Sequence, residues 1–139
     1  MTALRDLGGT KWSGRAELWL DPLGNDVDTC DCRIEVEADR IAYHWSYKGK
    51  PHVGRVVLRP GGADFTDSWH SESVMVCVTA PSPWAMIDVL GTYDGGEGSE
   101  WGWRILLALR PSDELVLQMT NVTPWGEEGR AVRMICSRE

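Results

Sequence analysis

The sequence predicts an all-β protein, an antiparallel up-and-down barrel of about 8 to 10 strands without a helical lid. Three observations lead to this expectation. Apolar and polar residues alternate with a period of two through most of the chain, segments rich in Gly, Pro, Asn and Asp separate the alternating runs at hairpin spacing, and no stretch sustains a period of 3.6 residues. Hairpin-sized connections favour a meander, and a meander closed on itself leaves no exposed sheet edge.

The composition fits one compact unit. The chain has 139 residues and a net charge of −7, so we expect residues 1–139 to form a single domain with one core. Acidic and basic residues are interleaved, which argues against a nucleic-acid surface. A net acidic surface would also repel an anionic membrane. The first residues lack the apolar core of a signal peptide, so we expect a cytoplasmic protein.

The first half of the chain contains the clearest alternation. Residues 30–38 alternate apolar with charged side chains, which predicts a strand with one dry and one wet face. Residues 11–20 before this strand and residues 41–48 after it alternate in the same way. In residues 52–59 the arginines share one face, which we interpret as the outer face.

The second half predicts further short strands. Residues 65–70 are expected to be one strand, in which alternation places Trp69 inside the barrel and His70 outside. The remaining strands are expected at residues 74–78, 86–93, 101–109, 115–121 and 130–137. The run at 101–109 is the most apolar, and its bulky residues on both faces indicate that it needs cover on two sides.

Three short motifs resemble a known family. Gly9-Thr-Lys-Trp-Ser-Gly14 is similar to the Gly-x-Trp start of the calycin barrels, which include the lipocalins and fatty-acid-binding proteins. Trp101-Gly-Trp-Arg104 and the later Asn121-Val-Thr-Pro-Trp-Gly126 resemble a lipocalin-like bacterial family known only as a domain of unknown function. The resemblance spans nearly the whole chain and implies an up-and-down barrel with a central cavity.

The resemblance also implies two structural details. In lipocalins an arginine of the closing strand packs across the tryptophan of the first strand, so Arg133 or, failing it, Arg130 is expected to stack on Trp12 as a cation–π contact. Residues 21–28 are too few for the two-helix lid that fatty-acid-binding proteins carry between their first strands. An open barrel mouth is therefore expected.

Neither a metal nor a cofactor is expected. The four cysteines are interpreted as buried apolar thiols, because Cys30 and Cys32 lack the Cys-x2-Cys spacing of zinc knuckles. Nitrobindins, a related barrel class, bind haem through a histidine near the end of the chain, whereas His44, His52 and His70 all lie at or before the midpoint. His44 and His70 are also expected on the outer face and His52 on the inner one, which disfavours a three-histidine metal site.

The alternation predicts which side chains line the interior. They form a mostly aromatic lining with a few polar groups, as small-molecule sites do: Tyr43, Trp45, Tyr47, His52, Phe65, Asp67, Trp69, Asp88, Trp103, Met119 and Asn121. The phase of residues 101–109 leaves two readings of Arg104 open. It either points inward toward a carboxylate ligand or points outward and pairs with an acid on a neighbouring strand.

Asp67 and Asp88 stand out as carboxylates on otherwise apolar faces. Burying a carboxylate costs several kcal/mol unless it is paired, hydrogen-bonded or protonated. Each is therefore a candidate general acid or base, and each is equally a candidate for a structural pair with Arg104 or His52.

Three functional hypotheses follow. The first is a lipocalin-like module that binds a small hydrophobic or amphipathic molecule. The second is a cofactor-free lyase, isomerase or hydrolase that uses Asp67 or Asp88 with a tyrosine, by analogy with other barrels of this kind. The third is a barrel filled by its own side chains that associates through Trp19 and other exposed aromatics. A homodimer is an open alternative under each.

Overall fold

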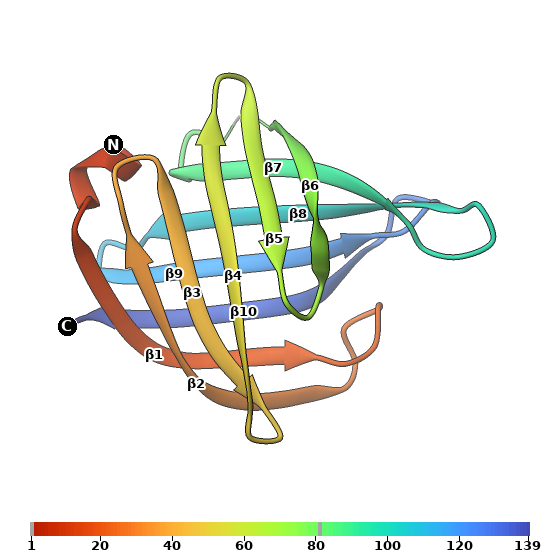
Figure 1. The fold of residues 1–139 in the computed structure, drawn as a ribbon, viewed down its shortest axis with the longest axis horizontal. Coiled ribbons are helices and arrows are strands. Elements are labelled where there is room, and N and C mark those ends of the chain that lie inside the picture. The colour runs from red at the N-terminus through yellow and green to blue at the C-terminus, as the bar shows by residue number, and fades with distance from the viewer. Residues whose placement is uncertain (1, 81) are drawn as a thin grey trace.

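The computed structural model describes residues 2–80 and 82–139, and its strands close into one antiparallel barrel (Figure 1). The strands are β1 (Thr10–Trp19), β2 (Val27–Val36), β3 (Arg40–Tyr47), β4 (Lys50–Arg59), β5 (Gly62–Asp67), β6 (Ser71–Thr79), β7 (Ile87–Asp94), β8 (Glu100–Leu109), β9 (Glu114–Val122) and β10 (Glu128–Arg138). Each strand pairs with the next along the chain, and β10 pairs with β1. The predicted all-β up-and-down barrel is confirmed.

The connections between strands are short. The segment between β1 and β2 is a loop, and the described residues contain no helical lid. A single 3-10 turn, η1 (Leu4–Leu7), precedes β1. Within residues 2–80 and 82–139, no helix has both the length and the hydropathy needed to cross a membrane.

The end of the barrel where β1 begins is closed by this turn. Leu4 and Leu7 of η1 are buried against the core. Trp12 is fully buried, its Nε1 donates to Oγ1 of Thr10 at 2.9 Å, and that hydroxyl donates to the carbonyl of Leu7 at 2.6 Å. These bonds fix the turn over this end of the barrel.

The cation–π contact on Trp12 involves a different arginine from the one expected. The guanidinium of Arg138 lies 4.9 Å from the Trp12 ring, so the assignment of this contact to Arg133 or Arg130 is wrong. The reason is the register of β1 and β10, which places Arg138 opposite Trp12 and Arg133 opposite Glu17. Arg130 stacks instead on Trp19, at 4.6 Å.

Strands β3 to β6 cross in front of β7 to β10 at a steep angle (Figure 1). The seam between β6 and β7 is the least paired part of the wall, because the ladder joins only Val78 with Leu90 and Thr79 with Val89. Farther along this seam Met75 packs against Gly91, where an added Cβ would lie 2.5 Å from the methionine sulfur. A methionine side chain thus fills the space where the strands diverge.

One strand is shorter than predicted. β5 ends at Asp67, and residues 68–70 form a turn into β6 rather than the rest of a strand over residues 65–70. Alternation therefore stops at Asp67. The two side chains that follow, Trp69 and His70, are placed by the turn and not by the pleat of a strand.

Candidate functional site

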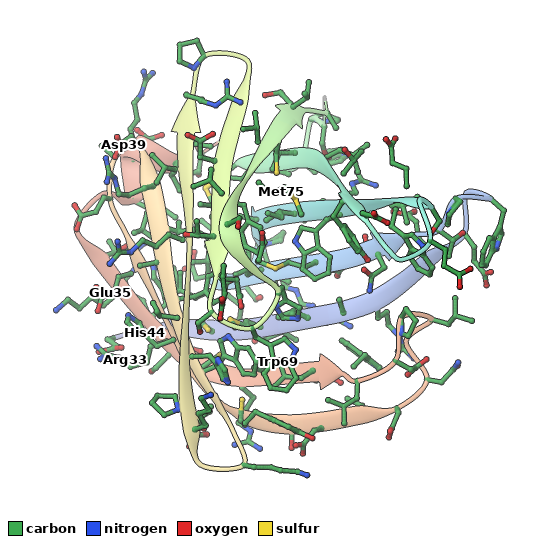
Figure 2. All side chains as sticks on the ribbon, turned by 45° about the vertical axis from the view of Figure 1, so that its right-hand side comes forward. Arg33, Glu35, Asp39, His44, Trp69 and Met75 are labelled. Carbon is green, nitrogen blue, oxygen red and sulfur yellow. The ribbon has the colours of Figure 1, made fainter. Side chains whose placement is uncertain are left out.

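A pocket of about 250 Å³ opens at the end of the barrel where β1, β5, β7 and β9 finish. We call it the mouth pocket, and it is lined by Trp19, Leu20, Asp21, Pro22, Trp69, His70, Met75, Tyr93, Trp103, Asn121 and Ala131. In Figure 2, Arg33 and His44 project outward from the barrel wall, whereas Trp69 and Met75 lie over the middle of the barrel. The outward position predicted for His44 is confirmed.

Five aromatic side chains, which we call the ring cluster, pack together at the pocket, and three of them, Trp69, His70 and Trp103, line it. The other two members are Trp45 and His52. Trp45 stacks on His52, with ring centroids 4.6 Å apart, and His52 meets Trp69 edge-on at 5.1 Å. The ring of His70 lies 4.9 Å from that of Trp103. The cluster therefore joins β3, β4 and β8 through the turn that follows β5.

Asp67 is the buried charge beneath the cluster. Its Oδ2 accepts the phenolic O–H of Tyr43, and its Oδ1 accepts the backbone N–H groups of Trp69 at 2.7 Å and His70 at 3.0 Å. Burial, the largest single effect, raises the pKa of Asp67, but the hydrogen bonds and the neighbouring His70 outweigh it, so the pKa lies below its usual value. The carboxylate is ionised at neutral pH. Burial and this carboxylate raise the pKa of Tyr43 well above its usual value.

His70 is the site residue that the sequence analysis missed. It was expected on the outer face, and that expectation is wrong: the side chain lines the mouth pocket, and Nδ1 lies 3.3 Å from Oδ1 of Asp67. The cause is the turn after Asp67, whose carboxylate binds the backbone of the next residues and bends the chain inward. The signal in the sequence was Asp67-Ser-Trp-His70, since Asp and Ser are residues that initiate such turns.

A second polar pair lies across the pocket from His70. The phenolic O–H of Tyr93 donates to Oδ1 of Asn121. Asn121 is opposite Trp103 in the register of β8 and β9, so the two side chains are neighbours on the inner face. Burial raises the pKa of Tyr93 above its usual value.

Most of the side chains predicted to face inward do so. The inner face of the barrel holds Tyr43, Trp45, Tyr47, His52, Phe65, Asp67, Trp103, Met119 and Asn121. Only Trp103 and Asn121 of this group reach the mouth pocket, together with Trp69 from the turn. The others pack beneath it, as Met119 does with its sulfur 3.9 Å from the Tyr43 hydroxyl. The interior is thus filled below the pocket.

Asp88 and Arg104 are not part of this pocket. Ile87 and Val89 face inward, so Asp88 between them lies on the outer face, and the expectation that it lines the interior is wrong. Arg104 also points outward and donates two hydrogen bonds to the Asp88 carboxylate, from Nε to Oδ1 at 3.0 Å and from Nη2 to Oδ2 at 2.8 Å. The hydrogen bond to Asp88 is the largest of the effects that raise the pKa of Arg104. The open alternatives for Arg104 are settled in favour of a structural pair.

Trp19 also differs from expectation. It is buried, lines the mouth pocket and carries the Arg130 guanidinium on its ring, so it is not an exposed aromatic available for association. Arg130 in turn donates to the carbonyl of Gly24 at 2.9 Å. This arginine therefore ties the β1–β2 loop to the rim of the pocket.

Several buried ring nitrogens near the pocket lack a hydrogen-bond partner among the described residues. They are Nε1 of Trp45, Nε2 of His52, Nδ1 of His70 and Nε1 of Trp103. Leaving a buried donor unpaired costs about 1 to 3 kcal/mol, and native proteins satisfy such groups with protein, water or ligand. The ring cluster therefore offers polar atoms that a bound molecule could satisfy.

The thiols and metal ligands give no second site. In the part of the chain that the structure describes, no group of three or more His, Cys, Asp and Glu side chains is arranged to hold a metal ion. All four cysteines are unpaired within these residues, and the Sγ atoms of Cys32 and Cys136 lie 3.5 Å apart on either side of Gly14. The hydrogen bond to Cys136 and burial raise the pKa of the Cys32 thiol.

No protein-family model matches the chain, and no curated protein matches it either. The site itself is therefore the basis for a functional conclusion.

Proposed function

We propose that this chain is a lipocalin-like barrel that binds a small hydrophobic or amphipathic molecule in the mouth pocket. The observation that carries the proposal is a cavity of about 250 Å³ walled by Trp19, Trp69 and Trp103. Its polar groups are His70, Tyr93, Asn121 and the rim carboxylate of Asp21. Apolar and aromatic walls with a few fixed polar groups are typical of small-molecule sites.

The size of the cavity limits the ligand. Sites for drug-sized molecules are roughly 300 to 1,000 Å³, and this pocket is smaller. A cavity of about 150 Å³ holds one benzene ring. The mouth pocket therefore suits a single ring system with a short substituent, and it is too small for a long acyl chain.

The lipocalin-like family is part of the same proposal. It is supported by the fully buried Trp12 near the start of β1, the arginine of the closing strand on its ring, and the 3-10 turn beneath it. A cytoplasmic location is also proposed, supported by four unpaired thiols among the described residues, since thiols persist in reducing compartments.

The test is to fill the pocket. Ala131 lines it and is buried, so Ala131→Phe should occupy the space of the ligand. The control is Ala42→Phe, on the outer side of β3. Native mass spectrometry of the purified protein and thermal shifts with small aromatic and aliphatic molecules should show binding in the wild type and in the Ala42 variant, and loss in a folded Ala131 variant. Equal binding by both variants would place the ligand elsewhere, and no binding by the wild type would contradict the proposal.

A second candidate is a cofactor-free acid–base enzyme, favoured by the contacts that join Tyr43, Asp67 and His70. In this version His70 is the group that reaches the substrate, and Asp67 positions it. A folded His70→Gln variant should keep binding and lose turnover. If no reaction is detected with the molecules that bind, the binding module stands alone.

The third hypothesis, association without a ligand, relies on exposed aromatics. Trp84 and Trp125 are 84% and 68% exposed, in the loops before β7 and before β10. The mouth pocket favours the binding module over this alternative. Sedimentation velocity measured over a range of protein concentrations would detect a homodimer.

A further inference from the structure

Two inward-facing side chains of the mouth pocket, Asn121 and Trp103, have hydrogen-bond donors that no described residue uses. The Tyr93 hydroxyl donates to Oδ1 of Asn121. The amide nitrogen Nδ2 of Asn121 has no partner among the described residues. Asn121 is 9% exposed and lines the pocket. A side-chain amide nitrogen has two N–H groups and no acceptor capacity.

Trp103 adds a second donor beside it. Its indole is 4% exposed, and Nε1 has no partner within residues 2–80 and 82–139. Because Trp103 and Asn121 are opposite each other in the β8–β9 register, the two donors come from adjacent positions on the inner face. The ring of His70 lies next to that of Trp103, with centroids 4.9 Å apart. One corner of the pocket therefore gathers two donor nitrogens without a partner among the described residues, and an imidazole.

The carboxylates near this corner already accept hydrogen bonds within the protein. Both oxygens of Asp67 are occupied by Tyr43 and by the backbone of the turn. Asp21, at the rim, accepts the backbone N–H groups of Asn25 and Asp26 at Oδ1 and the Asn25 amide at Oδ2. Most of their acceptor capacity is therefore taken, whereas a ligand that brings acceptors meets donors that no described residue uses.

A cationic ligand would find two of the three tryptophans of the pocket already covered. A cation needs an open ring face, and the guanidinium of Arg130 already lies over Trp19 at 4.6 Å. Trp103 has His70 on one side at 4.9 Å and Phe65 stacked at 6.1 Å. Trp69, 45% exposed at the mouth, remains as a surface for a flat apolar ring.

We infer that the mouth pocket takes a planar aromatic carboxylate, whose carboxylate oxygens accept hydrogen bonds from Asn121, Trp103 and His70 while its ring packs against Trp69. The inference rests on the proposed binding function and adds the class of ligand. A carboxylate is acceptor-only and takes several N–H donors at once, and hydrogen bonds to it are about twice as strong as neutral ones.

The test uses three probes that share one ring: indole-3-acetate, indole-3-acetamide and tryptamine. Titration calorimetry with the full chain should rank the acid at least about tenfold above the amide, with the amine weakest. Asn121→Asp has the same shape, replaces the donor by an acceptor and keeps a partner for Tyr93. It should weaken the acid about tenfold or more and leave the amide nearly unchanged.

The matched control is Gln118→Glu, which adds the same charge to the outer face of the same strand. It should change neither affinity. Trp103→Phe supplies an independent variant, because it removes the indole N–H and keeps an aromatic ring, and it too should reduce the preference for the acid. If Asn121→Asp fails to fold, the Trp103 variant decides.

Two outcomes would overturn the inference alone: the amide or the amine binding the wild type as tightly as the acid, or a folded Asn121→Asp protein binding the acid with unchanged affinity. Another outcome would also contradict the proposed binding function. If none of the three indoles binds, and octanoate and benzyl alcohol also fail to bind, the proposed binding function falls together with the inference.

Discussion

Oδ1 of Asp67 lies 3.3 Å from Nδ1 of His70 and also accepts the backbone N–H of the same histidine. One carboxylate oxygen therefore binds the main chain of His70 and lies close to its imidazole. Through Oδ2 the same carboxylate holds the buried Tyr43 hydroxyl. The β5–β6 turn, the floor of the barrel and the wall of the mouth pocket thus depend on a single buried charge.

Asp67→Asn should lower the free energy of unfolding by about 1 to 3 kcal/mol, because the amide nitrogen replaces an oxygen that accepts a hydrogen bond and the charge-assisted bonds are lost. Urea denaturation followed by tryptophan fluorescence measures the change. Asp28→Asn, at an exposed position of β2, is the control and should have little effect. An Asp67 variant as stable as the wild type would show that these bonds do not stabilise the turn.

The pH dependence of stability should change in the same variant. Because folding lowers the pKa of Asp67, its ionised form stabilises the folded state above the usual carboxyl pKa of about 3.9, and this contribution is lost as the pH falls through the lowered value. Between about pH 5 and about pH 3 the wild type should therefore lose more stability than Asp67→Asn. Asp21 and Asp39, whose pKa values are also lowered, are present in both proteins, so the difference isolates Asp67. Parallel pH profiles would contradict this account.

The fold was predictable because nearly every strand has one face toward the core and one toward solvent, which produces alternation in the sequence. In β2 and β4 the alternation fixes which side chains are buried, and His52 is inside as that pattern requires. The site was only partly predictable. His70 was misplaced because nothing in the alternation shows where a strand stops, and the bond from Asp67 to its backbone forms only once the turn exists.

Asp88 was misplaced for another reason. It is a single charge in an apolar run, and such a run gives no phase from which to assign a face. What decides its position is Arg104 on the neighbouring strand, and the register that brings the two together is not visible in the sequence. Contacts between strands are therefore the part of this site that required the structure.

The Asp88–Arg104 pair should contribute to stability and not to binding. Asp88 has a side chain only 3% exposed and Arg104 one that is 39% exposed, so solvent screens the pair in part. A double-mutant cycle with Asp88→Asn and Arg104→Gln should give a coupling energy of about 1 kcal/mol. Ligand affinities in the mouth pocket should stay within about twofold of the wild type, because the pair lies on the outer face and does not line the pocket. A large loss of binding in folded Asp88→Asn would contradict the outer-face assignment.

Gly54 makes room for Tyr43. A Cβ added at Gly54 would lie 2.1 Å from Cζ of the Tyr43 ring, so Gly54→Ala forces the ring away from Asp67. We expect a loss of about 1 to 3 kcal/mol in the free energy of unfolding, as for other overpacked cores. In a Tyr43→Val background the same alanine should have much less effect, because the ring is gone. Equal losses in the two backgrounds, measured by urea denaturation, would show that the glycine is needed for a reason other than this ring.

The stacking of Arg138 on Trp12 should stabilise the closed end of the barrel. Arg138→Ala is expected to lower the free energy of unfolding by about 0.5 to 2 kcal/mol, the range of cation–π contacts, and Arg138→Lys by less. A cycle with Trp12→Phe should show coupling between the two residues, because phenylalanine gives the weaker cation–π partner. Arg133→Ala is the control, since Arg133 lies opposite Glu17 in the register and not opposite Trp12. If Arg138→Ala and Trp12→Phe are additive, the arginine acts through something other than the indole, and the contact is a consequence of the register alone.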